Sequence, residues 1–231
     1  MEDGKKMIKI NVLYEDNHII VVEKPFNILS QGDSTGDLDL LTMVKDYIKV
    51  KYNKPGNVYI GLVHRLDRPT GGIMVFARNS KSAARMNKQF IDHTIAKNYL
   101  LACHGKVDKS GKMIDMIKKL ENGNSIISND GKEASLDYEL VDYNSEDDTS
   151  LVKVKLNTGR HHQIRVQFAS RNHPLCGDKR YGIEDSTKQL CLYSYRLEFN
   201  HPVSGETMIF ESFPKKMGGW TGFTMSKNVQ K

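Results

Sequence analysis

The chain has 231 residues, of which 39% are hydrophobic and 27% are charged, proportions typical of an ordinary soluble globular protein. It contains no run of about 18 apolar residues that could cross a membrane, and its polar first residues are unlike a secretory signal. Its three cysteines are far apart and form no Cys-x-x-Cys pair, which argues against a disulfide framework and a zinc site. The net charge of +6 suits a polyanionic partner. We expect a cytoplasmic protein with reduced cysteines.

Two strands are expected at the start of the chain. Alternating apolar residues predict a strand at 8–13, and a run of β-branched residues predicts a second at 18–24, joined to the first by a turn at 14–17. Pro25 ends the second strand, because proline has no N–H to donate to a sheet. A polar, glycine-rich stretch at 31–37 then predicts a loop.

Two amphipathic helices are expected in the first half of the chain. Apolar residues at helical spacing predict one helix over 40–52, with Asp39 as its N-cap. The second helix is predicted over 80–91 and is capped by Asn79 or by the serine after it. Ala84 is expected on the apolar side of this second helix.

A charged turn lies between two apolar strands predicted at 58–63 and 73–77. The turn contains the single carboxylate Asp67 between Arg65 and Arg68, and the cations favour its ionised form. The Pro-Thr-Gly-Gly sequence that follows predicts a tight reversal. Taken alone, this spacing is more often a solvated ion-pair cluster than a catalytic site. A kinase-type loop is a weaker alternative, since no asparagine follows at the required spacing and no glycine-rich phosphate loop precedes it.

The second half of the chain is rich in predicted strands. Residues 96–105 are expected to form a strand that starts with a polar segment, and alternation predicts strands at 132–140 and 150–157. The acidic stretch 142–148 joins the last two as a loop, which predicts an antiparallel pair. Residues 106–129 are rich in lysine, glycine and asparagine, so we expect hairpins or an irregular excursion there.

A second basic motif, T-G-R-H-H-Q-I-R-V-Q, occupies residues 158–167. We expect Thr-Gly to turn the chain and the stretch from Arg160 to Arg165 to open a helix. Cations near a helix N-terminus oppose its dipole, so these charges should have a partner elsewhere. His161 and His162 are adjacent and are expected to point in different directions, which makes them a poor metal-binding pair.

Three segments resemble the motifs of the RluA-type RNA pseudouridine synthases. Residues 64–72 resemble the H-R-L-D-R-x-T-x-G signature, and residues 158–165 resemble the T-G-R-x-H-Q-I/L-R motif. Residues 177–182 resemble the G-D-x-x-Y-G loop. The motifs occur in the order of the family and the resemblance covers nearly the whole chain. The first two motifs, taken together, outweigh the ion-pair interpretation.

The resemblance implies an α+β fold with a mixed, largely antiparallel sheet, flanking helices and loops, and a catalytic cleft across the sheet. We expect one catalytic domain over residues 11–214, preceded by a short segment, 1–10, and followed by a tail, 215–231. Trp220 is the one expected anchor of that tail. The small N-terminal RNA-binding domain of many relatives is expected to be absent.

The resemblance also implies roles for individual residues. Asp67 is the expected catalytic carboxylate, and Arg165 is expected to pair with it. Tyr99, in a Lys-x-Tyr sequence, is expected to cover the uracil and is a candidate for proton transfer at C5. Whether Asp67 attacks C1′, stabilises an oxocarbenium-like state or removes the 2′ proton stays open. The remaining residues expected to contact RNA are His64, Arg65, Arg68, Arg160, His162, Gln163 and Ile164.

The expected function is the isomerisation of specific uridines to pseudouridine in structured ribosomal or transfer RNA. This reaction changes no oxidation state and adds no atoms, so we expect no cofactor and no metal. RNA is the expected partner of a monomer, without a role for DNA or membranes. An RNA-binding or assembly protein on the same fold, with incidental or lost catalysis, is the alternative. A glycoside hydrolase is a poor fit, since neither motif contains the second carboxylate of the usual pair.

Overall fold

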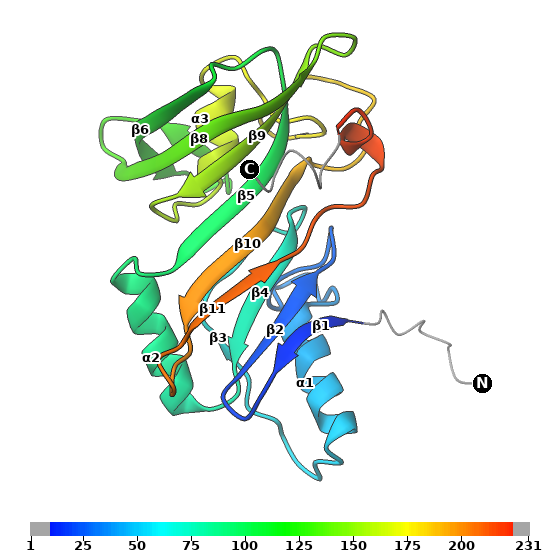
Figure 1. The fold of residues 1–231 in the computed structure, drawn as a ribbon, viewed down its shortest axis with the longest axis vertical. Helices are drawn as coiled ribbons and strands as arrows, with labels where there is room; N and C mark the ends of the chain where they lie inside the picture. Colours follow the sequence, from blue (N-terminus) through cyan, green and yellow to red (C-terminus); the bar gives the residue numbers. More distant parts are fainter. Residues whose placement is uncertain (1–9, 224–231) are drawn as a thin grey trace, which may run out of the picture.

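The computed structural model describes residues 10–223, so the predicted start of the first strand at Ile8 lies outside the described residues. Eleven strands form one sheet (Figure 1). In chain order they are β1 (Asn11–Glu15), β2 (Ile19–Lys24), β3 (Gly61–Leu62), β4 (Gly71–Ala77), β5 (Ala96–His104), β6 (Ser110–Lys119), β7 (Ser125–Ile127), β8 (Lys132–Asn144), β9 (Thr149–Leu156), β10 (Leu192–Asn200) and β11 (Thr207–Glu211).

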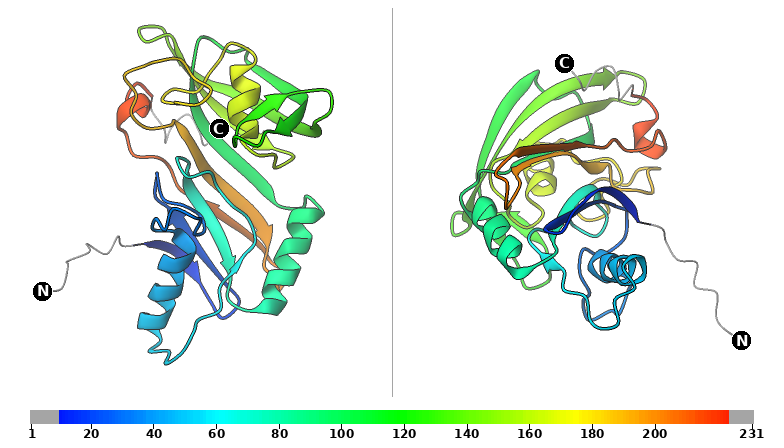
Figure 2. Two further views of the ribbon diagram at one scale, coloured as in Figure 1. Left: turned by 180° about the vertical axis from the view of Figure 1, so that it is seen from behind. Right: turned by 60° about the horizontal axis from the view of Figure 1, so that its bottom comes forward.

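The strand order in space is β1-β2-β4-β10-β5-β9-β8-β6-β7, with β3 added to β4 and β11 added to β10. Among the strand pairs of the described residues, β4 and β10 run parallel and the others antiparallel. The predicted α+β fold with a mixed, largely antiparallel sheet is therefore confirmed. In Figures 1 and 2 the strands β1–β4 and β11 build one half of the molecule, β6–β9 build the other, and the long β5 and β10 run between them.

The two predicted helices and their caps are present. Helix α1 spans Leu40–Lys51, and the Asp39 carboxylate accepts the Thr42 N–H at 2.9 Å. Helix α2 spans Ser80–Ile91 and is capped by Asn79. Each cap acts over three residues, which is why local sequence sufficed to predict it.

The third helix, α3 (Gln163–Ala169), begins later than predicted. Arg160 precedes it in the connecting loop, so only Arg165 of the two motif arginines lies on the helix. The N-cap residue His162 has a left-handed backbone, with φ of 52°. None of the helices in the described residues is long and apolar enough to cross a membrane.

Strand alternation divides the core into two faces. Met74 and Phe76 of β4 pack in the cluster that contains residues of α1 and of α3, including Phe168. Ile73 and Val75 point the other way and pack in the cluster that contains α2. The face that contains α1 and α3 also includes Leu66, Tyr99 and Ile164, and it is the face on which the cleft opens.

Several predicted element boundaries were wrong. Tyr14 and Glu15 belong to β1 rather than to a turn, since they pair with Val21 and Ile20. Strand β8 runs to Asn144, into the predicted acidic loop, because its last residues still pair with β9. Ala84 is exposed rather than on the apolar side of α2.

The strand predicted at 58–63 is reduced to the two residues of β3. The predicted excursion at 106–129 is the hairpin of β6 and β7.

The two glycines after the charged turn start β4 and do not form the turn itself. At the second of them, Gly72, the backbone requires a glycine. Its φ is +116°, a conformation that residues with a Cβ rarely adopt. A Cβ on Gly72 would lie 2.3 Å from the Ser194 carbonyl oxygen. Gly72 and Ser194 form part of the parallel β4–β10 pair, so this glycine allows the two strands to approach.

The C-terminal segment returns to the sheet. Trp220, in the short helix η1 (Gly218–Trp220), is buried as expected, and Phe223 is a second anchor beside it. Both pack in a cluster with Tyr193 and Tyr195 of β10.

Candidate active site

Asp67 lies on the loop between β3 and β4, and backbone contacts hold this loop on both sides of it. The Ser30 hydroxyl donates to the Leu66 carbonyl at 2.7 Å and accepts the Leu66 N–H at 3.1 Å. The Lys24 ammonium donates to the Arg68 carbonyl at 3.0 Å. The residues immediately before and after Asp67 are therefore tied to the end of β2 and to the loop that follows it.

Lys24 is only 1% exposed, which is rare for a lysine. Its ammonium also donates to the carbonyls of Pro25 and Ile28, at 3.1 and 2.5 Å. Burial lowers the pKa of Lys24 to about 7, against the opposing effect of the Asp67 charge. The sequence marks this position as the end of a strand, in a Glu-Lys-Pro sequence that resembles the end of the first hairpin in the RluA-type enzymes. Its role in holding the Asp67 loop could not be predicted, since the Arg68 carbonyl is brought to Lys24 only by the fold.

A cleft of about 1530 Å³ opens over Asp67. Among its lining residues, nine are lysines or arginines and two are aspartates, so the cleft is far more basic than the whole chain. The cationic residues are Arg65, Arg68, Lys97, Lys119, Arg160, Arg165, Lys179, Arg180 and Lys188. A basic cleft concentrates and orients a polyanion.

The two oxygens of the Asp67 carboxylate have different surroundings. Oδ2 lies 3.5 Å from Nη1 of Arg165 and 3.7 Å from Nε2 of His162. Within the described residues, no hydrogen bond or ion pair reaches Oδ1. The side chain is 28% exposed and lines the cleft. One oxygen therefore faces two nitrogen atoms of the second motif, while the other is open to a substrate.

Arg165 is near Asp67, but its closest partner is a different carboxylate. Its Nε and Nη2 donate to the two oxygens of Asp178 at 2.8 and 2.6 Å. Burial lowers the pKa of the Arg165 guanidinium, but Asp178 and then Asp67 outweigh this effect and raise it. Burial likewise raises the pKa of Asp178, but Arg165 outweighs it and lowers that pKa. Both residues are charged, and the sequence alone did not single out Asp178.

The prediction that the two adjacent histidines point in different directions was wrong. The rings of His161 and His162 stack with their centroids 3.7 Å apart. The left-handed backbone of His162 allows this arrangement. Nδ1 of His162 lies 2.7 Å from the Tyr181 hydroxyl. Burial, and then the charge of Arg165, lowers the pKa of His162 to about 3, so its imidazole is neutral.

Tyr99 is placed in the cleft by β5 and is 8% exposed. Burial, followed by the charge of Asp67, raises the pKa of its hydroxyl. The phenol is therefore protonated and cannot act as a base until its proton has moved. Lys97 lies two residues earlier on the same strand, lines the cleft and has a pKa lowered by burial.

Three predicted residues of the first motif differ in exposure and contacts. Nε2 of His64 accepts the Val75 N–H at 3.0 Å, and its ring stacks on Phe90 with centroids 4.9 Å apart. Burial lowers the pKa of His64 to about 3. Arg68 forms an ion pair with Asp37 at 2.7 Å. Arg65 is exposed at the cleft.

The remaining predicted residues hold the second motif together. Oε1 of Gln163 accepts the Thr158 hydroxyl at 2.8 Å and the Arg160 N–H at 3.0 Å. Its Nε2 donates to the Ser135 carbonyl at 3.1 Å. Nε of Arg160 is bonded to a backbone carbonyl of β8, although the residue itself is exposed. Ile164 is 5% exposed and lines the cleft.

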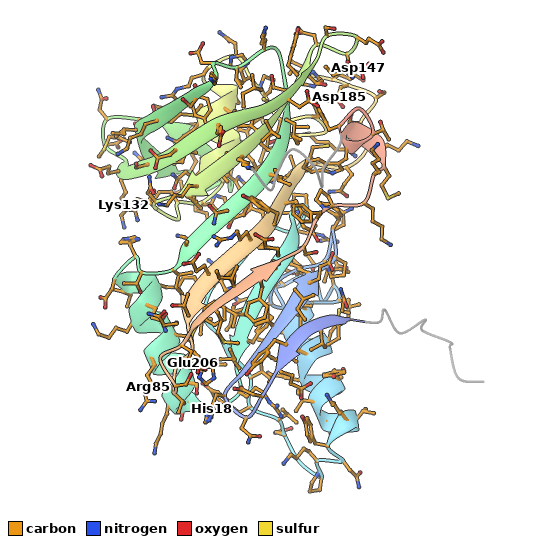
Figure 3. The ribbon with its side chains drawn as sticks, viewed as in Figure 1. His18, Arg85, Lys132, Asp147, Asp185 and Glu206 are labelled. Atoms are coloured by element: carbon orange, nitrogen blue, oxygen red, sulfur yellow. The ribbon has the colours of Figure 1, made fainter. Side chains whose placement is uncertain are left out.

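One cluster of potential metal ligands lies outside the cleft. Ligand atoms of His104, Cys176 and Asp185 are within 4.8 Å of one another. Nε2 of His104 is hydrogen-bonded to Asp185 at 2.8 Å, and the same carboxylate accepts the N–H groups of Gly177 and Thr187. The cluster is therefore explained by hydrogen bonds that hold the loop before β10 to itself and to His104 at the end of β5. Figure 3 labels Asp185 near the short C-terminal helix, at the end of the molecule away from His18.

Comparison with known proteins agrees with this geometry. A family model described as RNA pseudouridylate synthase matches residues 18–170. An "Uncharacterized RNA pseudouridine synthase" of Aquifex aeolicus is 37% identical over 222 residues, which cover 88% of this chain and 69% of that protein. A "Ribosomal large subunit pseudouridine synthase C" of Buchnera aphidicola is 30% identical and covers 88% of this chain and 67% of that protein.

Solved structures show the same fold. The human "RNA Pseudouridylate Synthase Domain Containing 1" superposes with a TM-score of 0.75 at 22% identity, over 95% of this chain and 89% of that one. The related human "RNA Pseudouridylate Synthase Domain Containing 4" gives a TM-score of 0.74 at 19% identity, over 89% of each chain. The motifs, the fold and the family match agree, and the chain belongs to the RNA pseudouridine synthase family, in its RluA-type group.

Proposed function

We propose that this RNA pseudouridine synthase modifies uridines of ribosomal RNA and that Asp67 is its catalytic carboxylate. The observation that carries the proposal is the asymmetry of this carboxylate: Oδ2 faces Arg165 and His162, while Oδ1 is open to the cleft. Similar proteins named for the large ribosomal subunit favour ribosomal over transfer RNA.

The reaction exchanges a C–N bond for a C–C bond and moves one proton. The N1–C1′ bond is cleaved, the uracil turns over, C5 bonds to C1′, the C5 proton leaves and N1 gains a proton. A carboxylate oxygen next to the ribose can serve this sequence in three ways: as the nucleophile at C1′, as a stabilising charge, or as the base for the 2′ proton. In each case the open Oδ1 is the atom that approaches the substrate.

Arg165 and Tyr99 support this role in different ways. The guanidinium favours the ionised form of Asp67 in a partly buried site. The phenol of Tyr99, which burial and Asp67 hold in its protonated form, lines the same cleft and would cover the uracil and pass a proton during the C5 step.

The target nucleotide must leave its stack to reach Asp67, because base chemistry on a paired or stacked nucleotide is blocked. Arg65 is exposed beside Asp67 and is suited to hold the displaced strand. His64 is less suited, since its Nε2 is occupied by the Val75 N–H. Arg68, Arg160 and the other cleft cations would then contact the flanking phosphates.

The proposal is tested by mapping pseudouridine in the RNA of cells that lack this gene. We expect one or a few sites in ribosomal RNA to be lost, and to be restored by the wild-type protein but not by Asp67→Asn. Asp33→Asn is the matched control, since Asp33 is the other carboxylate in the cleft lining. Sites lost only in transfer RNA would contradict the substrate proposal. Restoration by Asp67→Asn would contradict the catalytic role and favour an RNA-binding function instead.

The proposed setting is a monomer in the cytoplasm that acts on RNA rather than DNA. Light scattering of the purified protein, alone and with the RNA that carries the mapped site, measures the oligomeric state. A stable dimer would contradict that part of the proposal.

A further inference from the structure

We propose that Asp178 and Tyr181 are positioning residues, which act through Arg165 and His162 to hold Oδ2 of Asp67 and leave Oδ1 free to react. The inference rests on the proposed catalytic role of Asp67. Both residues belong to the loop at 177–182, within the connection between α3 and β10.

Asp178 decides which edge of the Arg165 guanidinium is available. It binds Nε and Nη2, one of the two edges of the guanidinium that can hold a carboxylate with two hydrogen bonds. This bidentate bond fixes the orientation of the guanidinium, in which Nη1 faces Oδ2 of Asp67 at 3.5 Å. Within the described residues, no contact of Arg165 reaches Oδ1 of Asp67. The guanidinium supplies its charge to Oδ2 without covering Oδ1.

Tyr181 decides which nitrogen of His162 carries the proton. The Tyr181 oxygen accepts the Ser125 N–H at 2.7 Å and lies 2.7 Å from Nδ1 of His162. Since the hydroxyl has one proton and the amide already donates to it, we assign that proton to the bond with Nδ1. A neutral imidazole with Nδ1 as acceptor carries its proton on Nε2, the atom that faces Oδ2 of Asp67 at 3.7 Å. This donor can close on Oδ2 when substrate fills the cleft, because catalytic hydrogen bonds often shorten in the complex.

The loop is built to hold these two side chains in place. Oδ1 of Asp178 also accepts the N–H groups of Arg180 and Tyr181, at 3.0 and 3.2 Å. Gly182 donates its N–H to the Asp178 carbonyl at 2.8 Å. The Tyr181 ring lies against the guanidinium, with Cζ of Arg165 5.1 Å from its centroid. Asp178 has a fully buried side chain, so its orientation does not depend on solvent.

The test compares Asp178→Asn and Tyr181→Phe with the wild type on an RNA fragment that contains the mapped uridine. The single-turnover rate at saturating enzyme is measured together with the dissociation constant for the same RNA. We expect the rate to fall on the order of 100-fold for Asp178→Asn and about tenfold for Tyr181→Phe. RNA affinity should change less than about threefold in both variants. A rate loss without an affinity loss distinguishes positioning from a general weakening of the site.

A double-mutant cycle tests the histidine arm. His162→Gln keeps a donor N–H but lacks the second ring nitrogen that Tyr181 binds in the wild type. In the His162→Gln background, adding Tyr181→Phe should therefore lower the rate by less than about twofold. Matched controls are Asp16→Asn, a part-buried carboxylate outside the cleft lining that also accepts two backbone N–H groups, and Tyr195→Phe, a buried tyrosine of β10. Both should keep the wild-type rate.

Each outcome separates this inference from the proposed function. No turnover by the wild type on this RNA, or full turnover by Asp67→Asn, would contradict the catalytic proposal itself. A dependence on Asp67 with wild-type rates for Asp178→Asn and Tyr181→Phe would overturn only the positioning inference. Equal losses of rate and RNA affinity would overturn it as well. If Asp178→Asn does not fold, Tyr181→Phe and the cycle with His162→Gln still decide the histidine arm.

Discussion

The two sides of the cleft hold their functional groups by different means. On the side of β3 and β4, the loop that carries Asp67 is tied by hydrogen bonds to backbone atoms. Ser30 bonds both polar backbone groups of Leu66, and Lys24 bonds the Arg68 carbonyl. These contacts fix the backbone of the loop and leave the carboxylate itself without a close partner.

On the side of α3, charged and ring nitrogen atoms are held by other side chains. Arg165 is fixed by the buried carboxylate of Asp178, and His162 by the hydroxyl of Tyr181. Asp67 is therefore positioned through the backbone of its loop, and its carboxylate oxygens stay available to a substrate. Arg165 and His162 are instead positioned through hydrogen bonds to their own side-chain nitrogen atoms. The second side should therefore lose stability in acid, because its contacts depend on the ionised carboxylate of Asp178.

The largest effect is expected from breaking the charged side. Arg165→Met removes the cation next to Asp67 and leaves Asp178 buried without its partner, a loss of about 3–5 kcal/mol in the free energy of unfolding. Turnover should fall by at least about 1000-fold, while RNA binding stays detectable. Urea denaturation and single-turnover kinetics measure the two effects.

Arg85→Met is the control for Arg165→Met. Arg85 is an exposed residue of α2 that donates to the Pro202 carbonyl and is labelled in Figure 3. This variant should keep both stability and turnover. Near-normal turnover by Arg165→Met would contradict the pairing with Asp67.

A smaller effect is expected on the backbone-tied side. Ser30→Ala removes both hydrogen bonds to Leu66 and leaves buried backbone groups unsatisfied, which should cost about 1–3 kcal/mol. Turnover should fall about tenfold, since the residue before Asp67 loses its anchor. Ser186→Ala, at an exposed serine, is the matched control. A Ser30→Ala protein with wild-type stability and turnover would show that the loop is held by other contacts.

The pH dependence of stability should distinguish the two sides. The pKa of Asp178 is lowered in the folded protein, because Arg165 outweighs the effect of burial. The folded state therefore binds fewer protons than the unfolded state, and the stability that Asp178 contributes is present above about pH 4 and lost as the pH falls through its folded pKa. Urea denaturation at pH 5.5 and 3 should show a smaller acid loss for Asp178→Asn than for the wild type. An equal loss in both proteins would mean that this carboxylate has no lowered pKa.

The smallest effect is expected at the rim of the cleft. Lys119→Ala removes one exposed cation from the cleft lining and should weaken RNA binding only a few fold. It should also make the slope of log binding constant against log salt concentration less negative by about 1. Lys49→Ala, on α1 and outside the cleft lining, should leave the slope unchanged. Filter binding over a series of salt concentrations measures both. An unchanged slope for Lys119→Ala would show that Lys119 does not contact an RNA phosphate.

Much of the fold followed from local sequence. The α1 and α2 boundaries were predicted closely, because Asp39 and Asn79 cap their helices within three residues. Strand boundaries were less accurate, and β8 is the clearest case. Its end depends on how far β9 can pair with it, and that length is a property of two segments together. The same reason explains why residues such as Tyr14 were assigned to a turn.

The sequence by itself determined the family, the fold class and the candidate carboxylate Asp67, since the motifs are contiguous and periodicity is a local property. Only the tertiary structure decided which groups surround that carboxylate. Arg165 was expected to pair with Asp67, yet its bidentate partner is Asp178, and neither Lys24 nor Ser30 was predicted to hold the loop of Asp67. The physical reason is that a hydrogen bond depends on distance and direction between groups far apart in the chain, which residue spacing does not specify.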